Sequence, residues 1–271
     1  MDKHTIGIGG QQIAYAQTEG TGPAIIFVHG NSASAGTWDR VMAGPIGQQH
    51  HCLALDLPGH GDSPPAADRA DYSLPGYAAV VAGFARETGA EDAVIVGWSL
   101  GGHIVIEAAP ALPSAAGFVI FGTPPVASAA QMGEAFLPNP AMNVGFTSDV
   151  TPQAALDYAS SFTAAGSPLT PDRFVPDILR TDGTAREALF ESIGQGRFAD
   201  ELAIVTALDR PLAILHGAGE QLVSLDYLRG LTLPSLWRGE VQVIEGAGHA
   251  PHQETPAAFA ALLAGFIADL A

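Results

Sequence analysis

The feature that most constrains this 271-residue chain is the heptapeptide GWSLGGH at 97–103, which directly follows the apolar run AVIV. Ser99 lies between a tryptophan and a leucine and is bracketed by Gly97 and Gly101. A Gly-x-Ser-x-Gly pattern between a strand and a helix is typical of a strained turn that exposes the serine hydroxyl at the carboxyl edge of a sheet. With 32 glycines the bare pattern also arises by chance. Its place after an apolar run nevertheless favours Ser99 as a nucleophile.

Short apolar runs alternate with longer segments of helical character along the chain. This order is typical of a mostly parallel sheet with crossover helices. We expect an antiparallel edge hairpin around TIGI and QIAYA, and core strands at 24–28, 52–56, 93–96, 118–121, 212–215 and 241–244. Helices are expected at 74–88, 100–109 and 255–270.

The segment 124–208 has no strong strand signal but contains helix-like pieces such as PQAALDYASSF and TAREALFESI. A structureless loop of this length is improbable inside a compact domain. We therefore expect a helical cap at 124–208, inserted into a core domain made of 1–123 and 209–271.

Composition excludes several classes of partner. The chain has 28 acidic and 11 basic residues, a net charge of −17, so a polyanion such as nucleic acid would be repelled. No apolar run approaches the roughly 18 residues of a membrane span. The start MDKHTIGIGGQQ lacks the pattern of a secretory signal, which favours a cytoplasmic protein. We expect a small-molecule substrate, no membrane partner, and a monomer or weak homodimer.

Cofactor and redox signals are equally sparse. The single cysteine, Cys52, lies in the apolar run CLALD and is expected to be a small buried hydrophobe. The sequence lacks a metal-binding cluster of the H-x-H-x-D-H type, and GIGG near the start does not fit a dinucleotide-binding pattern. We expect no cofactor and no metal.

A serine hydroxyl needs a base and an acid that orients the base. His249, in GAGH after the last expected strand, is the expected base. His252, three residues later, ranks second, because a surface or capping residue is expected there. Glu220, in HGAGE after strand 212–215, is the expected acid, because GTPPV after FVIF offers no carboxylate. Asp226 is its competitor but falls on an expected helix. The remaining histidines, His103 among them, are expected to be core or loop residues.

An oxyanion hole would need two backbone N–H groups near the serine. Leu100, directly after the nucleophile, is expected to supply one of them. Asn31, in HGNSAS after strand 24–28, is expected to supply the other, although His-Gly-Asn is also compatible with a simple turn.

The motifs HGNS, DLPGHGDS, GWSLGGH, HGAGE and GAGH occur in an order that resembles the α/β-hydrolase superfamily. At a finer level HGNSAS, DLPGHG, GWSLGGHI, GTPPVA and RTDG together resemble the α/β-hydrolase type of N-acylhomoserine lactonase. The resemblance implies a mostly parallel eight-stranded sheet flanked by helices, with an inserted helical cap. It also implies a triad of Ser99, Glu220 and His249, with Asn31 and Leu100 as the oxyanion hole.

The resemblance extends less securely to the substrate pocket. A cap tyrosine approaches the lactone in that group, and Tyr158 in ALDYASS matches it, although a buried cap aromatic explains Tyr158 equally well. Asn31, Phe136 and Met142 are expected to contact the substrate as well. The wider set of residues that could line an acyl-chain pocket, or simply form core, is Met132, Phe136, Met142, Phe146 and Phe162.

From the site residues and the resemblance together, we predict a serine hydrolase that opens the lactone ring of N-acylhomoserine lactone signals through an acyl-enzyme. A general carboxylesterase is the main alternative. Cofactor-free haloperoxidases and carbon-carbon bond hydrolases share similar caps and stay open. A receptor that keeps this fold without turnover is a further alternative, but it has no need for a complete Ser, His and Glu set.

Overall fold

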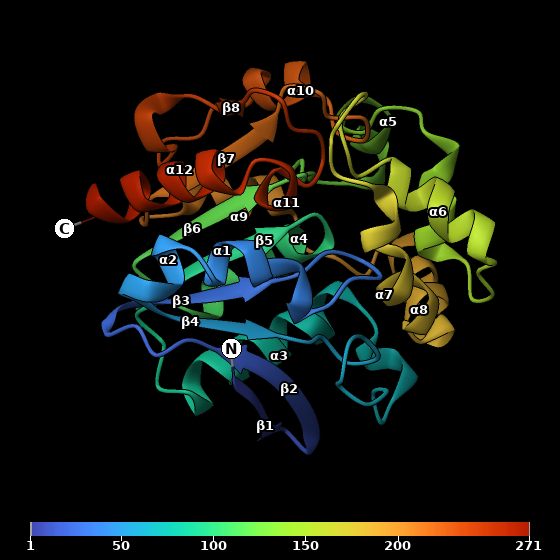
Figure 1. Cartoon of the computed structure of the whole chain (residues 1–271), viewed down its shortest axis with the longest axis horizontal. Coiled ribbons are helices and arrows are strands. Elements are labelled where there is room, and N and C mark those ends of the chain that lie inside the picture. Colours follow the sequence, from blue (N-terminus) through green and yellow to red (C-terminus); the bar gives the residue numbers. More distant parts are fainter. Residues whose placement is uncertain (1, 271) are drawn as a thin grey trace.

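The computed structural model describes residues 2–270 and contains one eight-stranded sheet (Figure 1). The strand order is β1-β2-β4-β3-β5-β6-β7-β8. The strands are β1 (Asp2–Ile8), β2 (Gln11–Gln17), β3 (Gly22–Val28), β4 (His50–Leu55), β5 (Val94–Trp98), β6 (Gly117–Phe121), β7 (Leu212–Gly217) and β8 (Gln242–Ile244). All the expected core strands are confirmed, with ends that differ by a few residues at most.

The mixed character of the sheet also agrees with the expectation. β1 and β2 form an antiparallel hairpin at one edge, and β2 pairs antiparallel with β4. All other neighbours are parallel. The central strands β5 and β6 are buried throughout, and so is the carboxyl-terminal half of β3, as expected for a parallel sheet covered on both faces. The carboxyl ends of these strands therefore meet at one protected edge.

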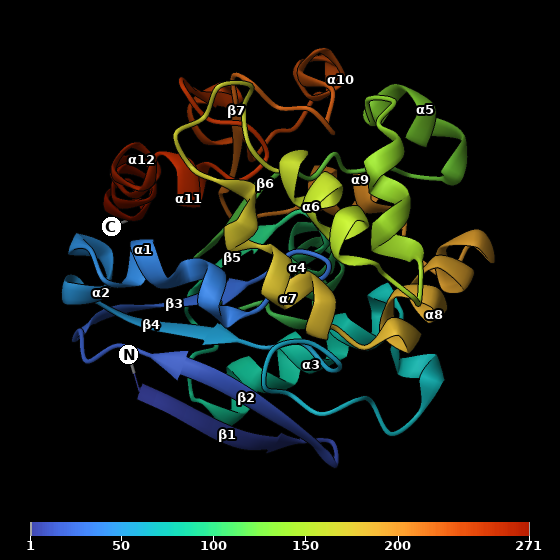
Figure 2. The same ribbon diagram turned by 45° about the vertical axis from the view of Figure 1, so that its right-hand side comes forward.

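Helices cover both faces of the sheet (Figure 2). On one face α3 (Leu74–Glu87) packs against α4 (Leu100–Ala108), and α4 in turn contacts α9 (Glu201–Ala207). The other face carries α1 (Asp39–Met42), α2 (Pro45–Gln49), α11 (Pro251–Glu254) and α12 (Pro256–Ala268). The three predicted helices correspond to α3, α4 and α12.

Between β6 and β7 the chain forms short helices rather than strands. They are η4 (Ala129–Gln131), α5 (Met132–Ala135), η5 (Pro140–Phe146), α6 (Pro152–Ser160), η6 (Pro171–Arg173), α7 (Val175–Arg180), α8 (Gly183–Gly194) and α9. Figures 1 and 2 show α5 to α8 gathered beyond the carboxyl ends of the strands. We propose that 124–208 acts as a cap, and call it the proposed cap below. No helix within residues 2–270 is long and apolar enough to span a membrane.

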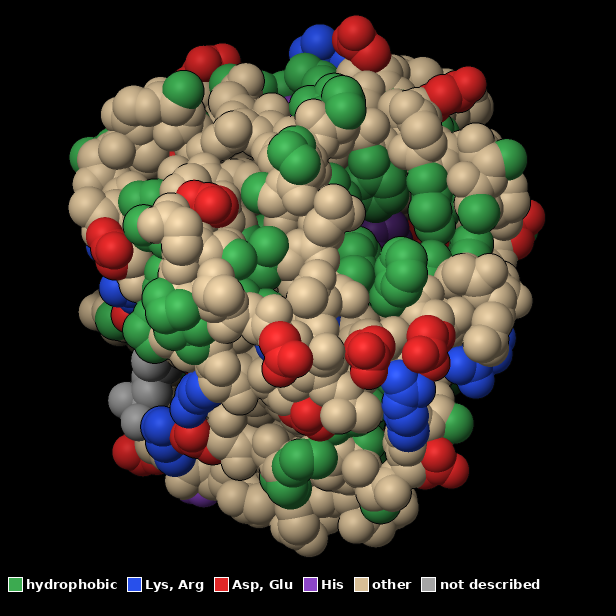
Figure 3. All heavy atoms as spheres, turned by 90° about the vertical axis from the view of Figure 1, so that its right-hand side faces the viewer, with side chains coloured by type: hydrophobic (Ala, Val, Ile, Leu, Met, Phe, Trp, Pro, Cys, Tyr) green, Lys and Arg blue, Asp and Glu red, His purple; other side chains and the backbone are tan. Residues whose placement is uncertain are grey.

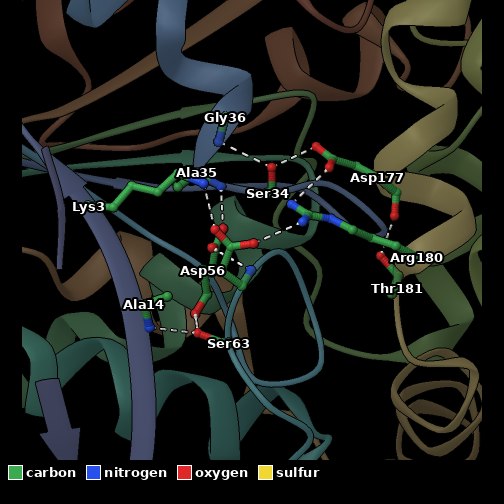
Figure 4. A network of polar contacts seen from close by, with 11 residues as sticks. Lys3, Ala14, Ser34, Ala35, Gly36, Asp56, Ser63, Asp177, Arg180 and Thr181 are labelled. Carbon is green, nitrogen blue, oxygen red and sulfur yellow. Dashed lines mark hydrogen bonds and ion pairs between the residues drawn. The ribbon is translucent and has the colours of Figure 1, made fainter. Parts of the chain in front are cut away.

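Polar contacts join the proposed cap to the loops of the sheet (Figure 4). The Ser34 hydroxyl donates to Asp177 of α7 at 2.6 Å. Arg180 of α7 pairs with Asp62 at 3.0 Å and with Asp177 at 3.2 Å. On the sheet side, the buried Asp56 accepts the N–H of Ala35 at 2.6 Å. These contacts place α7 directly over the loops that follow β3 and β4.

Candidate active site

Ser99 occupies the sharp turn that the sequence predicts. Its backbone has φ 54° and ψ −120°, a strained conformation for a residue with a side chain, and α4 begins at the next residue. A Cβ at Gly97 would collide with the carbonyl of Gly101, and one at Gly101 would collide with the carbonyl of Val28. The two glycines that bracket Ser99 are therefore required by the close approach of strand and helix.

Glu220 and His249 are brought together from the loops after β7 and β8. His249 Nδ1 lies 2.8 Å from Glu220 Oε2, and both side chains are only 2% exposed. The other oxygen of Glu220 accepts the N–H groups of Gln221 and Leu222 at 2.9 and 2.8 Å. Burial alone would raise the pKa of Glu220, but His249 and the N–H of Leu222 outweigh it and hold the pKa below its ordinary value. The acid is thus kept ionised beside the imidazole.

The second ring nitrogen of His249 is not engaged by Glu220, which bonds Nδ1. His249 Nε2 is buried and has no hydrogen-bond partner within residues 2–270. Ser99 and His249 both line this cavity. Catalytic hydrogen bonds are often long in the absence of substrate, so the arrangement is compatible with proton transfer between the two. Gly122, at φ +61°, leaves room for the imidazole, because a Cβ there would lie 2.6 Å from the ring.

The two competing residues lie elsewhere. His252 was expected to be a surface or capping residue, and that interpretation is wrong: it is completely buried, between Trp38 and Trp98. Its Nε2 bonds the Thr37 hydroxyl at 2.9 Å, and burial holds its pKa well below the ordinary value. Asp226 is exposed on α10 (Leu225–Gly230), as the sequence suggested.

Asn31 and Leu100 both border the cavity beside Ser99. Leu100 is the first residue of α4, where backbone N–H groups have no partner within the helix. The Asn31 N–H donates no hydrogen bond within the described chain. Its side chain is engaged, since Nδ2 donates to the Gly145 carbonyl at 2.6 Å and Oδ1 accepts the Ser32 hydroxyl at 3.0 Å. Both N–H groups are therefore available for an oxyanion.

The cavity has a volume of about 290 Å³ and a mainly apolar wall. Of the residues expected to line it, Phe162 does not: it packs behind the wall against Trp98 and Tyr158. The expected residues that do line it are Met132, Phe136, Met142, Phe146 and Tyr158. Figure 3 shows a hollow on this face, rimmed by hydrophobic side chains, with a histidine at its floor.

Several lining residues were not identified from the sequence. They are Leu74, His103, Val126, Leu189, Ile193, Phe198, Glu201 and Leu222. For His103 a signal existed, because it lies four residues after Ser99 on the expected helix and therefore one turn away. Leu74 begins α3, one of the expected helices. The others come from the proposed cap and from the loop after β7, where periodicity gives no guide.

Tyr158 lies on α6 of the proposed cap and is only 6% exposed. Burial raises the pKa of its phenol, so the group stays neutral. The phenol oxygen would be 2.7 Å from a Cβ at Gly145, so this glycine leaves space beside it. Tyr158 is thus a neutral hydroxyl at the cavity wall.

The loop that carries His249 is bonded directly to the proposed cap. The N–H of Ala250 donates to the Phe162 carbonyl at 2.8 Å. The Glu254 carboxylate accepts the N–H of Ala164 at 2.8 Å and that of Gly248 at 2.6 Å. One carboxylate therefore bonds both the proposed cap and the loop that carries His249.

Comparison with known proteins identifies relatives along the whole chain. Residues 25–262 match the model of the alpha/beta hydrolase family. One similar structure is that of an N-acyl homoserine lactonase, AidH, complexed with N-hexanoyl homoserine lactone, with 36% sequence identity and a TM-score of 0.94. The match covers 100% of this chain and 98% of that one. Another AidH structure, complexed with N-butanoyl homoserine, is 37% identical, also with a TM-score of 0.94, over 100% of this chain and 97% of that one.

Two curated proteins are also similar. A pimeloyl-[acyl-carrier protein] methyl ester esterase of Methylococcus capsulatus is 30% identical over 94% of this chain and 98% of that protein. A component of the acetoin cleaving system of Cupriavidus necator, named as a dihydrolipoyllysine-residue acetyltransferase, is 35% identical over 39% of this chain, which spans only 28% of that longer protein. The match over 25–262 and the similarity along nearly the whole chain show that this protein belongs to the alpha/beta hydrolase family.

Proposed function

We propose that the protein is a serine hydrolase that opens the lactone ring of N-acylhomoserine lactones, using Ser99, His249 and Glu220. The observation that carries the proposal is the likeness to the AidH lactonase, which spans the whole chain and so includes the proposed cap. The site supports it, because a nucleophile and a His-carboxylate pair open into an apolar cavity that suits an acyl chain.

In the proposed reaction, Ser99 Oγ attacks the lactone carbonyl while His249 Nε2 accepts its proton. Glu220 holds the imidazole through Nδ1 and stabilises its charged form. The N–H groups of Asn31 and Leu100 receive the negative charge that develops on the carbonyl oxygen. His249 then gives its proton to the ring oxygen as the carbon-oxygen bond breaks.

The ring-opened hydroxyl stays attached to the acyl-enzyme, so it can reclose the ring. Water activated by His249 must attack the ester faster than this hydroxyl does. We propose that Tyr158 binds the lactone through its phenol and that Met142 and Phe136 hold the acyl chain. Contacts of this kind would let the new hydroxyl move away from Ser99 while the chain stays bound.

The test is to incubate the purified protein with N-hexanoyl homoserine lactone and identify the products by mass spectrometry. A lactonase adds one water to the intact molecule, whereas an acylase releases hexanoic acid. Ser99→Ala should lower turnover by about four to six orders of magnitude, in line with losses on removal of other triad serines. Release of hexanoic acid, or an unchanged lactone, would overturn the proposal.

A carboxylesterase is the second candidate, favoured by the similarity to the pimeloyl-[acyl-carrier protein] methyl ester esterase. The same site residues would serve that reaction, with an alcohol as the leaving group. To distinguish the two functions, kcat/KM for N-hexanoyl homoserine lactone is compared with kcat/KM for methyl hexanoate and for an aryl hexanoate. A higher value for the simple esters than for every acylhomoserine lactone tested would favour the carboxylesterase.

A further inference from the structure

A second histidine-carboxylate pair borders the cavity, at the side of α4. His103 Nδ1 lies 2.8 Å from Glu201 Oε1 and 3.0 Å from Oε2. His103 comes from α4 and Glu201 from the first turn of α9. Both line the same cavity as Ser99 and His249. Neither His103 nor Glu201 has a part in the proposed attack on the lactone carbonyl.

Glu201 fixes the orientation and the tautomer of His103. The Glu201 side chain is completely buried, and its Oε2 also accepts the N–H of Val126 at 3.0 Å. A carboxylate that accepts from two sides places the ring proton of His103 on Nδ1. Nε2 is then the open polar atom of a ring that is 13% exposed, and it has no hydrogen-bond partner within residues 2–270.

Bonding to Glu201 does not explain why the residue at 103 carries a second ring nitrogen, Nε2. Nδ1 alone satisfies the carboxylate, so an asparagine amide in the same place would serve the same structural purpose. The neighbouring wall is apolar, formed by Val126, Met132 and Phe136. An unpaired nitrogen costs binding free energy when a purely apolar chain covers it and displaces its water. A ligand that carries a polar group at this point removes that cost.

The position of His103 indicates which atom of the substrate it meets. Four residues along α4 correspond to about 6 Å from Ser99. In an extended acylhomoserine lactone, five bonds separate the reacting carbonyl carbon from the third carbon of the acyl chain, also about 6 Å by the dimensions of an extended chain. An acyl chain that runs along α4 from Ser99 therefore brings its third carbon to His103.

We propose that His103, held by Glu201, recognises a hydroxyl group on the third carbon of the substrate's acyl chain. This inference rests on the proposed lactonase function. A hydroxyl pairs with Nε2 in either state of the ring, because it donates to the neutral imidazole and accepts from the charged one. A keto oxygen pairs only with the charged ring, and an unsubstituted chain pairs with neither.

The test compares kcat/KM of the wild-type protein for three lactones of equal length, N-hexanoyl, N-(3-oxohexanoyl) and N-(3-hydroxyhexanoyl) homoserine lactone. One hydrogen bond to a neutral group corresponds to a preference of about three- to tenfold for the hydroxy substrate over the unsubstituted one. A ratio of one or below would overturn the inference while leaving the proposed function intact.

Variants separate recognition from a structural role. His103→Asn keeps a donor where Nδ1 lies but removes Nε2, so the ratio should fall to about one. His103→Gln reaches further and should restore part of the preference. Met132→Leu alters the apolar wall alone and should change kcat/KM for all three lactones by the same factor. An Asn variant that folds normally and keeps the wild-type ratio contradicts the assignment.

A binding measurement distinguishes failure of this inference from failure of the proposed function. Calorimetry with the ring-opened N-(3-hydroxyhexanoyl) and N-hexanoyl homoserines requires no turnover. Tighter binding of the hydroxy compound, by about three- to tenfold, supports recognition by His103 even if no lactone is opened. Equal binding of the two compounds overturns it whatever the enzyme hydrolyses.

Discussion

The two acidic residues that the sequence offers as partners of His249, Glu220 and Asp226, differ sharply in their surroundings. Glu220 is buried against His249, whereas Asp226 is exposed on α10. Glu220→Gln should lower kcat by about 10³- to 10⁴-fold, because it removes the charge that faces the imidazole. Asp226→Asn is the matched control and should stay within about twofold of wild type. Steady-state kinetics of both variants, with circular dichroism to verify folding, decides the assignment; the reverse ranking would make Glu220 the wrong acid.

Tyr158 offers a second residue-scale prediction, because its neutral phenol belongs to a residue that lines the same cavity as Ser99. Tyr158→Phe should lower kcat/KM for N-hexanoyl homoserine lactone by about tenfold, the loss of one hydrogen bond to the substrate. The effect on a small aryl ester should stay within about twofold. Equal losses on both substrates would point to packing of the ring instead. Met142→Leu, which changes the same cavity without removing a hydroxyl, is the control.

At the scale of elements, the turn between β5 and α4 depends on the absence of side chains. Gly101→Ala places a methyl group against the Val28 carbonyl of the neighbouring strand, where no flexible side chain can yield. We expect a loss of about 3 kcal/mol in the free energy of unfolding. Gly133→Ala on α5 meets nothing within 4 Å and should be neutral or slightly stabilising. Urea denaturation measures both, and a neutral Gly101→Ala would refute the close-packing explanation.

The α4 helix also carries a partly buried carboxyl, Glu107, that gives a prediction about pH. Burial raises its pKa from 4.5 to about 7, although the N–H of Ala199 donates to it. Between these values the folded state binds more protons than the unfolded state, so this group lowers stability progressively as pH rises from about 4.5 to 7.

Glu107→Gln removes this titration while keeping an acceptor for Ala199. The variant should therefore gain stability relative to wild type between pH 5 and pH 8, by about 1 kcal/mol after allowance for partial exposure. This corresponds to about 2–4 °C in melting temperature. Exposed Glu91, replaced by Gln, is the control. A melting-temperature difference that does not vary with pH would contradict the raised pKa of Glu107.

The elements were more predictable than the contacts between them. The core strands and the strand-Ser99-helix turn follow from apolar runs and glycine spacing, which are local properties of the sequence. The position of the short helices in the proposed cap depends on tertiary packing, and the sequence indicated only that helices occur there. The partner of His103 lies 98 residues further along the chain, and nothing in the local sequence of either residue indicates the other.

In the candidate site, too, local sequence predicted some features, whereas others depend on tertiary packing. The sequence-predicted nucleophile, base and acid are brought to one edge of the sheet because each follows a parallel strand. The triad roles, the oxyanion hole and the roles of Tyr158, Phe136 and Met142 stay predictions until activity is measured. His252 could not be placed from its position three residues after His249, because its burial depends on Trp38 and Trp98, which lie far away in sequence.

For the molecule as a whole, ion pairs connect the proposed cap to the sheet domain. Arg180 pairs with Asp62, and both side chains are a little under half exposed. A pair at this exposure contributes about 0.2–1 kcal/mol and weakens as salt rises. A double-mutant cycle of Arg180→Gln and Asp62→Asn should give a coupling of about 0.5 kcal/mol at low salt that falls by half or more at 0.5 M NaCl.

A second double-mutant cycle, on an ion pair outside the interface with the proposed cap, is the control for this prediction. Arg210 and Asp209 lie next to each other in the sequence, 3.8 Å apart and outside the cap interface. Their coupling should be close to zero at every salt concentration. A salt-independent coupling between Arg180 and Asp62 would mean that the interface excludes solvent more completely than the exposure of these side chains indicates.

The hydrogen bonds that Glu254 and Ala250 make to Ala164 and Phe162 have a consequence for protein engineering. The proposed cap, 124–208, and the loop that carries His249 are joined by these hydrogen bonds, although the two segments are distant in sequence. A chimera that receives a foreign cap alone would lose these bonds and leave the loop that carries His249 without its support. Transplants between relatives should therefore exchange both segments together, and libraries that recombine them independently should yield many folded but inactive proteins.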